Sequence, residues 1–218
     1  MKRSISRVIR WGAQIFDKDQ FIYAALGDST AEGIGASSPD AAYPSLLAKY
    51  LTTQYKNVVY VNFGKRGAKS RHVLATQVDK AIAKQPHLIT LSVGANDIRF
   101  GVTIRTFSNQ LKQILIRLQS ETRARIVVTS IPDFSDTPRV PKFLKRPTAI
   151  SIKRYNIALS LIARELKIPL VNVFPAASHY FKRHPEVIAS DGFHPSDFGY
   201  YIWANSILMA LRQIKIVV

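Results

Sequence analysis

The sequence predicts an α/β fold, a three-layer α/β/α sandwich with a mostly parallel sheet of about five strands. Short apolar segments rich in β-branched residues alternate with longer segments whose apolar residues recur at helical spacing. This alternation is typical of parallel sheets that are covered by helices on both faces. The length of 218 residues suits a single domain. We expect that domain at residues 21–218, after an N-terminal basic amphipathic segment at residues 1–20.

The strands and helices follow from the apolar pattern. Five short apolar segments, bounded by residues that favour turns, are expected as buried strands. They are residues 21–26, 57–62, 87–93, 125–131 and 168–173. Helical spacing predicts five longer helices, with Ser70 as the N-cap of the second. They are residues 39–55, 70–84, 103–120, 148–166 and 196 to about 215. Residues 133–147 are rich in proline and basic side chains, which predicts a surface loop and suggests a lid.

The N-terminal segment has a pattern of its own. Residues 1–16 combine four cationic side chains with apolar side chains at helical spacing. They predict an amphipathic helix that either docks on the domain or lies on an anionic membrane, and docking is the preferred interpretation. The uncharged stretch is too short for a signal peptide, and no apolar run is long enough to span a bilayer. We therefore expect a cytoplasmic protein, with peripheral membrane contact as the alternative.

The charge balance and the lack of cysteine limit the chemistry. Lys and Arg total 31 against 14 Asp and Glu, which gives a net charge of +17. A field of that sign attracts anions such as nucleic acid, anionic lipid or charged substrates, although a basic surface without a dedicated partner explains it equally well. No recognised nucleic-acid motif is found, so no nucleic acid is expected as a partner. The absence of cysteine excludes disulfides, a cysteine nucleophile and thiolate metal ligands.

Four short polar segments lie where an open α/β sheet binds ligands, at the ends of strands. Residues 27–30 follow the first predicted strand, residues 62–70 the second and residues 94–97 the third, while residues 191–195 precede the last helix. Each segment taken alone is also explained as an ordinary turn or helix cap. The functional interpretation therefore depends on the order of the four segments along the chain.

The side chains in these segments suit acyl transfer. Ser29 stands on a strand-to-helix turn, where its hydroxyl is accessible and its N–H can face an oxyanion. Asn96 offers a side-chain NH₂ donor, and a glycine after the second strand lets the backbone come close to a ligand. Asp191 stands three residues before His194, with a glycine between them. Its carboxylate can therefore fold back and hold one tautomer of the imidazole.

In this order the four segments resemble the four sequence blocks of the GDSL/SGNH hydrolase superfamily. The resemblance covers residues 26–31, 62–70, 93–97 and 191–194. It implies an SGNH-hydrolase or flavodoxin-like fold. It also implies a serine hydrolase, esterase-like or lysophospholipase-like, that cleaves carboxylic esters or thioesters through an acyl-enzyme intermediate. Neither a metal nor another cofactor is implied.

Matched residue by residue, the resemblance implies a role for each polar group. Ser29 is expected as the nucleophile and the first donor of the oxyanion hole. Gly67 and Asn96 are expected as the other two donors. His194 is expected as the general base and Asp191 as the residue that orients it.

Three further positions complete the comparison with the family blocks. Asp28, beside the nucleophile, is expected to support the site. Gly64 is the rival of Gly67 for the glycine role, and Gly67 is preferred because its sequence context is closer to the family block. Thr30 departs from the leucine in the family name, at a position that varies.

The sequence does not identify the substrate. A carbohydrate O-deacetylase and an acyl-CoA thioesterase of the same superfamily are the enzymatic alternatives. A polyanion-binding α/β module is the non-enzymatic one. The basic charge favours a small anionic ester substrate, such as a phospholipid, an acyl-CoA or a glycan ester, which the basic side chains of residues 133–147 would meet. A solvated basic loop is the other explanation of those side chains.

Overall fold

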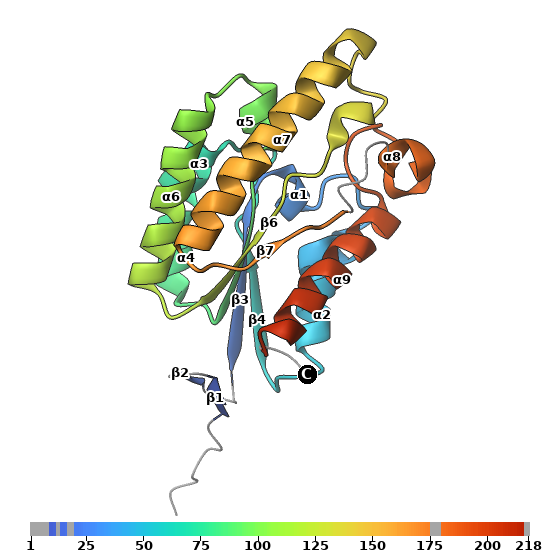
Figure 1. Cartoon of the computed structure of the whole chain (residues 1–218). Helices are drawn as coiled ribbons and strands as arrows, with labels where there is room; N and C mark the ends of the chain where they lie inside the picture. Colours follow the sequence, from blue (N-terminus) through green and yellow to red (C-terminus); the bar gives the residue numbers. More distant parts are fainter. Residues whose placement is uncertain (1–8, 12–13, 17–19, 175–179, 216–218) are drawn as a thin grey trace, which may run out of the picture.

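A five-stranded parallel sheet lies at the centre of the fold (Figure 1). The computed structural model describes residues 9–11, 14–16, 20–174 and 180–215. The sheet has the order β4-β3-β5-β6-β7, and every neighbouring pair of strands is parallel. Its strands are β3 (Phe21–Gly27), β4 (Val58–Asn62), β5 (Leu88–Ser92), β6 (Arg125–Thr129) and β7 (Leu170–Val171). The predicted sandwich with a parallel sheet is confirmed.

Helices cover both faces of the sheet (Figure 1). On one face lie α3 (Ser70–Thr76), α4 (Val78–Lys84), α6 (Ile104–Glu121) and α7 (Lys142–Glu165). On the other lie α2 (Tyr43–Leu51) and α9 (Asp197–Gln213). Short helices shape the loops: α1 (Ser29–Glu32), η1 (Pro39–Ala41), α5 (Ala95–Arg99), η2 (Phe134–Asp136), α8 (Tyr180–Arg183) and η3 (Pro185–Val187).

The strands are buried on both sides, which explains their continuous apolar composition. In β3, Ala24 and Leu26 face the core beneath α6 and α7, whereas Tyr23 and Ala25 face the core beneath α2 and α9. All five residues of β5 are buried. The two cores therefore hold the central strands rigidly, and the loops at their carboxyl ends start from fixed positions.

Two predicted helices are interrupted. The expected helix at residues 39–55 divides into η1 and α2, with prolines at the start of each. The expected helix at residues 70–84 divides into α3 and α4 at the buried Gln77. Its side chain donates to the carbonyl of Gly27 and accepts from its N–H, both at 2.8 Å, and so ties this break to the end of β3.

The prediction that Ser70 caps a helix is wrong by one residue. Lys69 occupies the N-cap position, and Ser70 is the first residue of α3. The hydroxyl and N–H of Ser70 both donate to the carboxylate of Asp97 instead. A contact far along the chain therefore replaces the local cap that the sequence pattern indicates.

The predicted loop at residues 133–147 is wrong in its second half. Helix α7 begins at Lys142 rather than at residue 148, and it contains Pro147. A proline removes one backbone hydrogen bond, here to the carbonyl of Phe143 four residues earlier. Phe143 is 79% exposed, so water reaches this first turn and can satisfy the carbonyl. The proline is therefore tolerated near the start of a helix that continues for many turns.

The predicted N-terminal helix is also wrong where the structure describes it. Strands β1 (Ile9–Trp11) and β2 (Gln14–Phe16) pair antiparallel as a small hairpin that precedes β3. Ile9 and Ile15 are β-branched and favour extended backbone. The rest of the expected helix lies outside the described residues. None of the described helices is both long enough and apolar enough to cross a bilayer.

Candidate active site

Ser29, His194 and Asp191 lie in one hydrogen-bonded series. The Ser29 Oγ is 3.0 Å from Nε2 of His194, and Nδ1 of the same ring is 2.5 Å from Oδ2 of Asp191. Ser29 and His194 are each only 7% exposed. The carboxylate can only accept, so Nδ1 carries a proton and a neutral ring leaves Nε2 free to accept from the serine hydroxyl.

The loop before α9 holds this carboxylate in place. Oδ1 of Asp191 accepts from the backbone N–H of Phe193 and of His194, at 2.9 and 3.0 Å. Gly192 between them has a φ of +70°, a conformation that favours glycine. Partial burial pushes the pKa of Asp191 up, but the hydrogen bonds from His194 and Phe193 outweigh burial, so its pKa lies below the usual value. The carboxylate therefore stays ionised beside the imidazole.

Ser29 is positioned by the start of α1. Gly27, with a φ of +142°, lies so close to β5 that an added Cβ would fall 2.0 Å from the carbonyl oxygen of Ser92. Asp28 is the N-cap of α1, and Ser29 is the first helical residue. The first N–H groups of a helix have no partner within it. In the part of the chain that the structure describes, no acceptor is found for the N–H of Ser29.

The two candidate glycines differ in their surroundings. The N–H of Gly64 donates to Oδ1 of Asn62, and a Cβ on Gly64 would fall 2.5 Å from the N of Glu32. Gly64 is thus needed where the loop packs against α1. Gly67 has a φ of +76°, and nothing lies within 4 Å of a Cβ placed on it. Its N–H finds no acceptor among the described residues, so it is available to a ligand.

Asn96 and Asp97 tie the loops after β4 and β5 together. The side-chain Nδ2 of buried Asn96 donates to the carbonyl of Ala68 at 3.1 Å, which leaves its second amide hydrogen available. Asp97 is fully buried and accepts from the N–H and hydroxyl of Ser70. Burial raises the pKa of Asp97, and the hydrogen bonds from Ser70 offset part of that rise. The segment containing Gly67 is therefore held close to Asn96.

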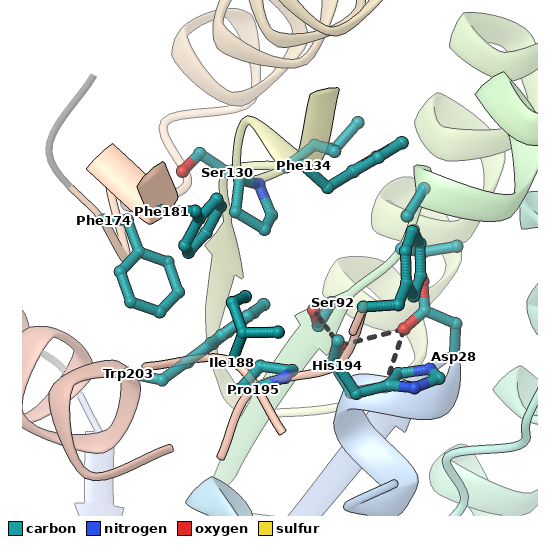
Figure 2. A pocket seen from close by; sticks show the side chains of 16 residues that line it. Asp28, Ser92, Ser130, Phe134, Phe174, Phe181, Ile188, His194, Pro195 and Trp203 are labelled. Carbon is teal, nitrogen blue, oxygen red and sulfur yellow. Dashed lines mark hydrogen bonds between the residues drawn. The ribbon is translucent and has the colours of Figure 1, made fainter. Parts of the chain in front are cut away.

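Asp28 is buried beside the site, and no hydrogen bond to His194 is found among the described residues. Its Oδ1 accepts from the N–H and the hydroxyl of Thr30, and that hydroxyl lies 2.9 Å from the hydroxyl of Ser92 (Figure 2). Burial raises the pKa of Asp28 to about 6, although the two hydrogen bonds from Thr30 act against the rise. The carboxyl group thus sits in an apolar environment that penalises its ionised form.

An aromatic pocket opens beside His194 (Figure 2). Its aromatic lining consists of Phe134, Phe174, Phe181, Phe193 and Trp203. Phe134 and Phe193 meet edge to face at 5.3 Å, and Phe174 and Phe181 at 5.1 Å. Asp28, Ser92 and Ser130 are among the few polar side chains in the lining. Such a pocket can receive an apolar group next to the imidazole.

Sequence reasoning missed several residues that shape the site. The aromatic lining carries no local signal, because its members are apolar residues like those of any core. The pairing of Gln77 with Gly27 joins residues 50 positions apart, and no motif marks it. Asp97 lies within a predicted polar segment, but no local pattern indicates its contact with Ser70.

Two other described histidines have structural contacts. His72 accepts from the N–H of Lys69 at the start of α3, and His87 accepts from the N–H of Ile22 at the start of the sheet. Within the described ranges, no group of three or more His, Asp or Glu side chains is arranged to hold a metal ion.

Comparison with known proteins identifies the family of the chain. A family model described as the GDSL-like Lipase/Acylhydrolase family matches residues 25–202. No curated protein matches the chain.

Solved structures resemble the fold at low sequence identity. A lipase/acylhydrolase from Enterococcus faecalis is 20% identical, with a TM-score of 0.72 over 88% of this chain and 96% of that one. An acetyl xylan esterase from Geobacillus stearothermophilus is 20% identical, with a TM-score of 0.71 over 92% and 98%. An α/β hydrolase enzyme from the metagenome of Lake Arreo, Spain, is 20% identical, with a TM-score of 0.71 over 89% and 96%. These likenesses show the shared fold.

The raised pKa of Asp28 predicts a pH dependence of stability. A carboxyl group whose folded pKa, about 6, exceeds its unfolded value of 3.8 favours folding when it is protonated. That contribution is present below the unfolded value and is lost as the pH rises through the folded one. We expect Asp28→Asn to remove this dependence, because Asn keeps an oxygen for Thr30 and carries no charge. As the pH rises from about 4 to 7, the free energy of unfolding of the variant should increase relative to that of the parent by up to about 3 kcal/mol.

Urea unfolding at a series of pH values measures this difference. The exposed Asp40, replaced in the same way, is the control. A constant difference between Asp28→Asn and the parent over the whole series would show that burial of Asp28 does not shift its titration.

Proposed function

Because the chain belongs to the GDSL-like lipase and acylhydrolase family, we propose that it hydrolyses carboxylic esters or thioesters through Ser29, His194 and Asp191. One observation supports these three residues above all: the serine hydroxyl, both imidazole nitrogens and the carboxylate form a continuous hydrogen-bonded series. A serine is a weak nucleophile at neutral pH unless a base accepts its proton. Nε2 of His194 lies within hydrogen-bonding distance of the hydroxyl and is placed to act as that base.

In the first half of the reaction the serine is acylated. Ser29 Oγ attacks the carbonyl carbon of the ester while Nε2 of His194 takes the hydroxyl proton. The imidazolium that forms is stabilised by Asp191, whose lowered pKa keeps it ionised. The tetrahedral intermediate collapses when His194 returns the proton to the leaving alcohol or thiol. The acyl group then remains on Ser29 as an ester.

Three donors are proposed to stabilise the oxyanion: the N–H groups of Ser29 and Gly67 and the Nδ2 of Asn96. Each has a hydrogen that no described residue accepts, and the contact of Asn96 with Ala68 keeps the last two together. A preorganised donor of this kind typically stabilises the transition state by about 3 kcal/mol. Gly64 is less suited to the role, because its N–H is already bound to Asn62.

Deacylation repeats the sequence with water as the nucleophile. His194 takes a proton from water, the hydroxide adds to the acyl carbon, and Ser29 leaves with the proton that His194 returns. The products are a carboxylic acid and the free enzyme. Asp28 is proposed to support the site because its hydrogen bonds to Thr30 hold the start of α1, where Ser29 lies.

The substrate we propose combines an apolar acyl group with an anionic part. The aromatic pocket beside His194 has a cavity volume of about 40 Å³, which suits a small apolar acyl group. Exposed Arg99 lies 5.9 Å from the ring of Phe193, and exposed Arg139 donates to the carbonyl of Asp191. Two cations therefore flank the histidine loop. Phospholipid, acyl-CoA and glycan esters all fit this description, and contact with an anionic membrane belongs to the same proposal.

Loss of the serine hydroxyl should abolish hydrolysis. We expect Ser29→Ala to lower kcat/KM for a short p-nitrophenyl ester by about 10⁴-fold or more, because no nucleophile replaces the hydroxyl. Its circular dichroism and melting temperature should match those of the parent. Ser120→Ala, at an exposed position of α6, is the matched control. A variant at residue 29 that retains full activity would exclude this serine as the nucleophile.

Loss of the amide donor should act on the chemical step. We expect Asn96→Ala to lower kcat by about 10²-fold with little change in KM, because the donor binds an oxygen that becomes negative only in the transition state. Steady-state kinetics on the same ester measures both constants, with exposed Asn109→Ala as the control. An unchanged kcat would remove Asn96 from the oxyanion hole.

A further inference from the structure

Helix α7 turns a stripe of large apolar side chains toward solvent. Phe143 is 79% exposed, Ile150 47%, Ile157 52% and Leu161 53%. Their spacing of seven, seven and four residues places them along one side of the helix. The opposite side packs into the core through Ile152, Tyr155, Leu159 and Ile162. The fold therefore does not use the outward stripe for its own packing, although polar residues normally occupy such a face.

The same helix has a large excess of positive charge. It carries six basic residues: Lys142, Lys145, Arg146, Lys153, Arg154 and Arg164. Its single acidic residue, Glu165, already binds Lys112 of α6 at 2.5 Å. Lys145 is 3.6 Å from Asp136, whereas no ion pair with a described residue is found for Lys142, Arg146, Lys153 or Arg154.

We propose that the outward face of α7 docks on the surface of an anionic lipid bilayer. Exposed phenylalanine and leucine-type side chains rimmed by Lys and Arg are the combination by which a helix lies in a membrane interface. Each cation near an anionic surface adds to the attraction, and the apolar stripe enters the acyl boundary. A second copy of the chain fits less well, because an isologous contact would bring the same unpaired cations together.

The position of α7 relates this docking to the aromatic pocket beside His194. A groove of about 680 Å³ runs between α7 and the carboxyl end of β7, and Ile150, Ile157 and Leu161 line its outer side. The groove shares Ser130, Ile131, Pro132 and Phe174 with the aromatic pocket that reaches His194. Ser130 and Phe174 are visible on the side of that pocket away from His194 (Figure 2). A bilayer docked on α7 would thus lie beside the wall that the groove shares with the histidine pocket and could present a lipid ester there, a consequence that rests on the proposed function.

Vesicle binding tests the docking separately from catalysis. Ser29→Ala serves as the parent, so that lipid is not consumed and binding is read without activity. It should cosediment with vesicles of equal parts phosphatidylcholine and phosphatidylglycerol, bind pure phosphatidylcholine far more weakly, and dissociate as salt is added. Replacing Lys142, Arg146, Lys153 and Arg154 together by Gln should weaken binding at least about tenfold. Replacing Phe143, Ile150 and Ile157 together by Ser should also weaken it about tenfold or more.

Matched controls separate this face from the general charge of the protein. Lys80, Lys84, Arg105 and Arg123 are exposed cations away from α7 and are replaced together by Gln. Ile116 and Met209 are exposed apolar residues of α6 and α9 and are replaced by Ser. Both controls should bind nearly as the parent does, and thermal unfolding verifies that every variant is folded.

Three outcomes would overturn the proposal. The first is a parent that does not bind anionic vesicles at low salt. The second is a control set of cations that weakens binding as much as the α7 set, which would assign binding to net charge alone. The third is a dimer in sedimentation velocity that the Phe143, Ile150 and Ile157 replacements dissociate, which would make the stripe an interface between copies. Loss of ester hydrolysis in Ser29→Ala is independent of all three.

Discussion

The site depends on the parallel pairing of β4, β3 and β5. Parallel neighbours end at the same edge of a sheet, so the loops that follow them are brought together without any further contact. Gly67, Ser29 and Asn96 stand on those three loops, in that order across the sheet. The carboxyl edge of three adjacent strands therefore determines where the proposed oxyanion donors lie. The loop before α9 adds His194 from the far end of the chain.

The sheet sets the approximate positions of these loops, and hydrogen bonds between the loops fix their positions more closely. Asp97 binds the start of α3, Asn96 binds the carbonyl of Ala68, and Gln77 binds both polar groups of Gly27. All three side chains are buried, and buried polar groups are costly unless they are paired. Their pairing makes any movement of these loops unfavourable. This rigidity is what a preorganised oxyanion hole requires.

The sequence was informative where local rules decide the structure and misleading where distant contacts do. The central strands and the order of polar segments followed from apolar runs and turn residues, and the family resemblance was confirmed. Pro147 suggested a loop, yet α7 begins at Lys142 and continues through the proline to Ile152 and Tyr155, which pack into the core. The aromatic pocket was not predictable, because Phe174 and Trp203 meet only after the chain has folded.

The proposed hydrolysis requires that His194 activates the Ser29 hydroxyl. Mass spectrometry of the folded protein after reaction with a fluorophosphonate tests it most directly, because the reagent labels only a serine whose proton is removed by a base. We expect one adduct per chain, located by peptide mapping on Ser29, and labelling that is at least about a hundredfold slower in His194→Ala. An adduct on another residue, or equally fast labelling without the imidazole, would contradict it.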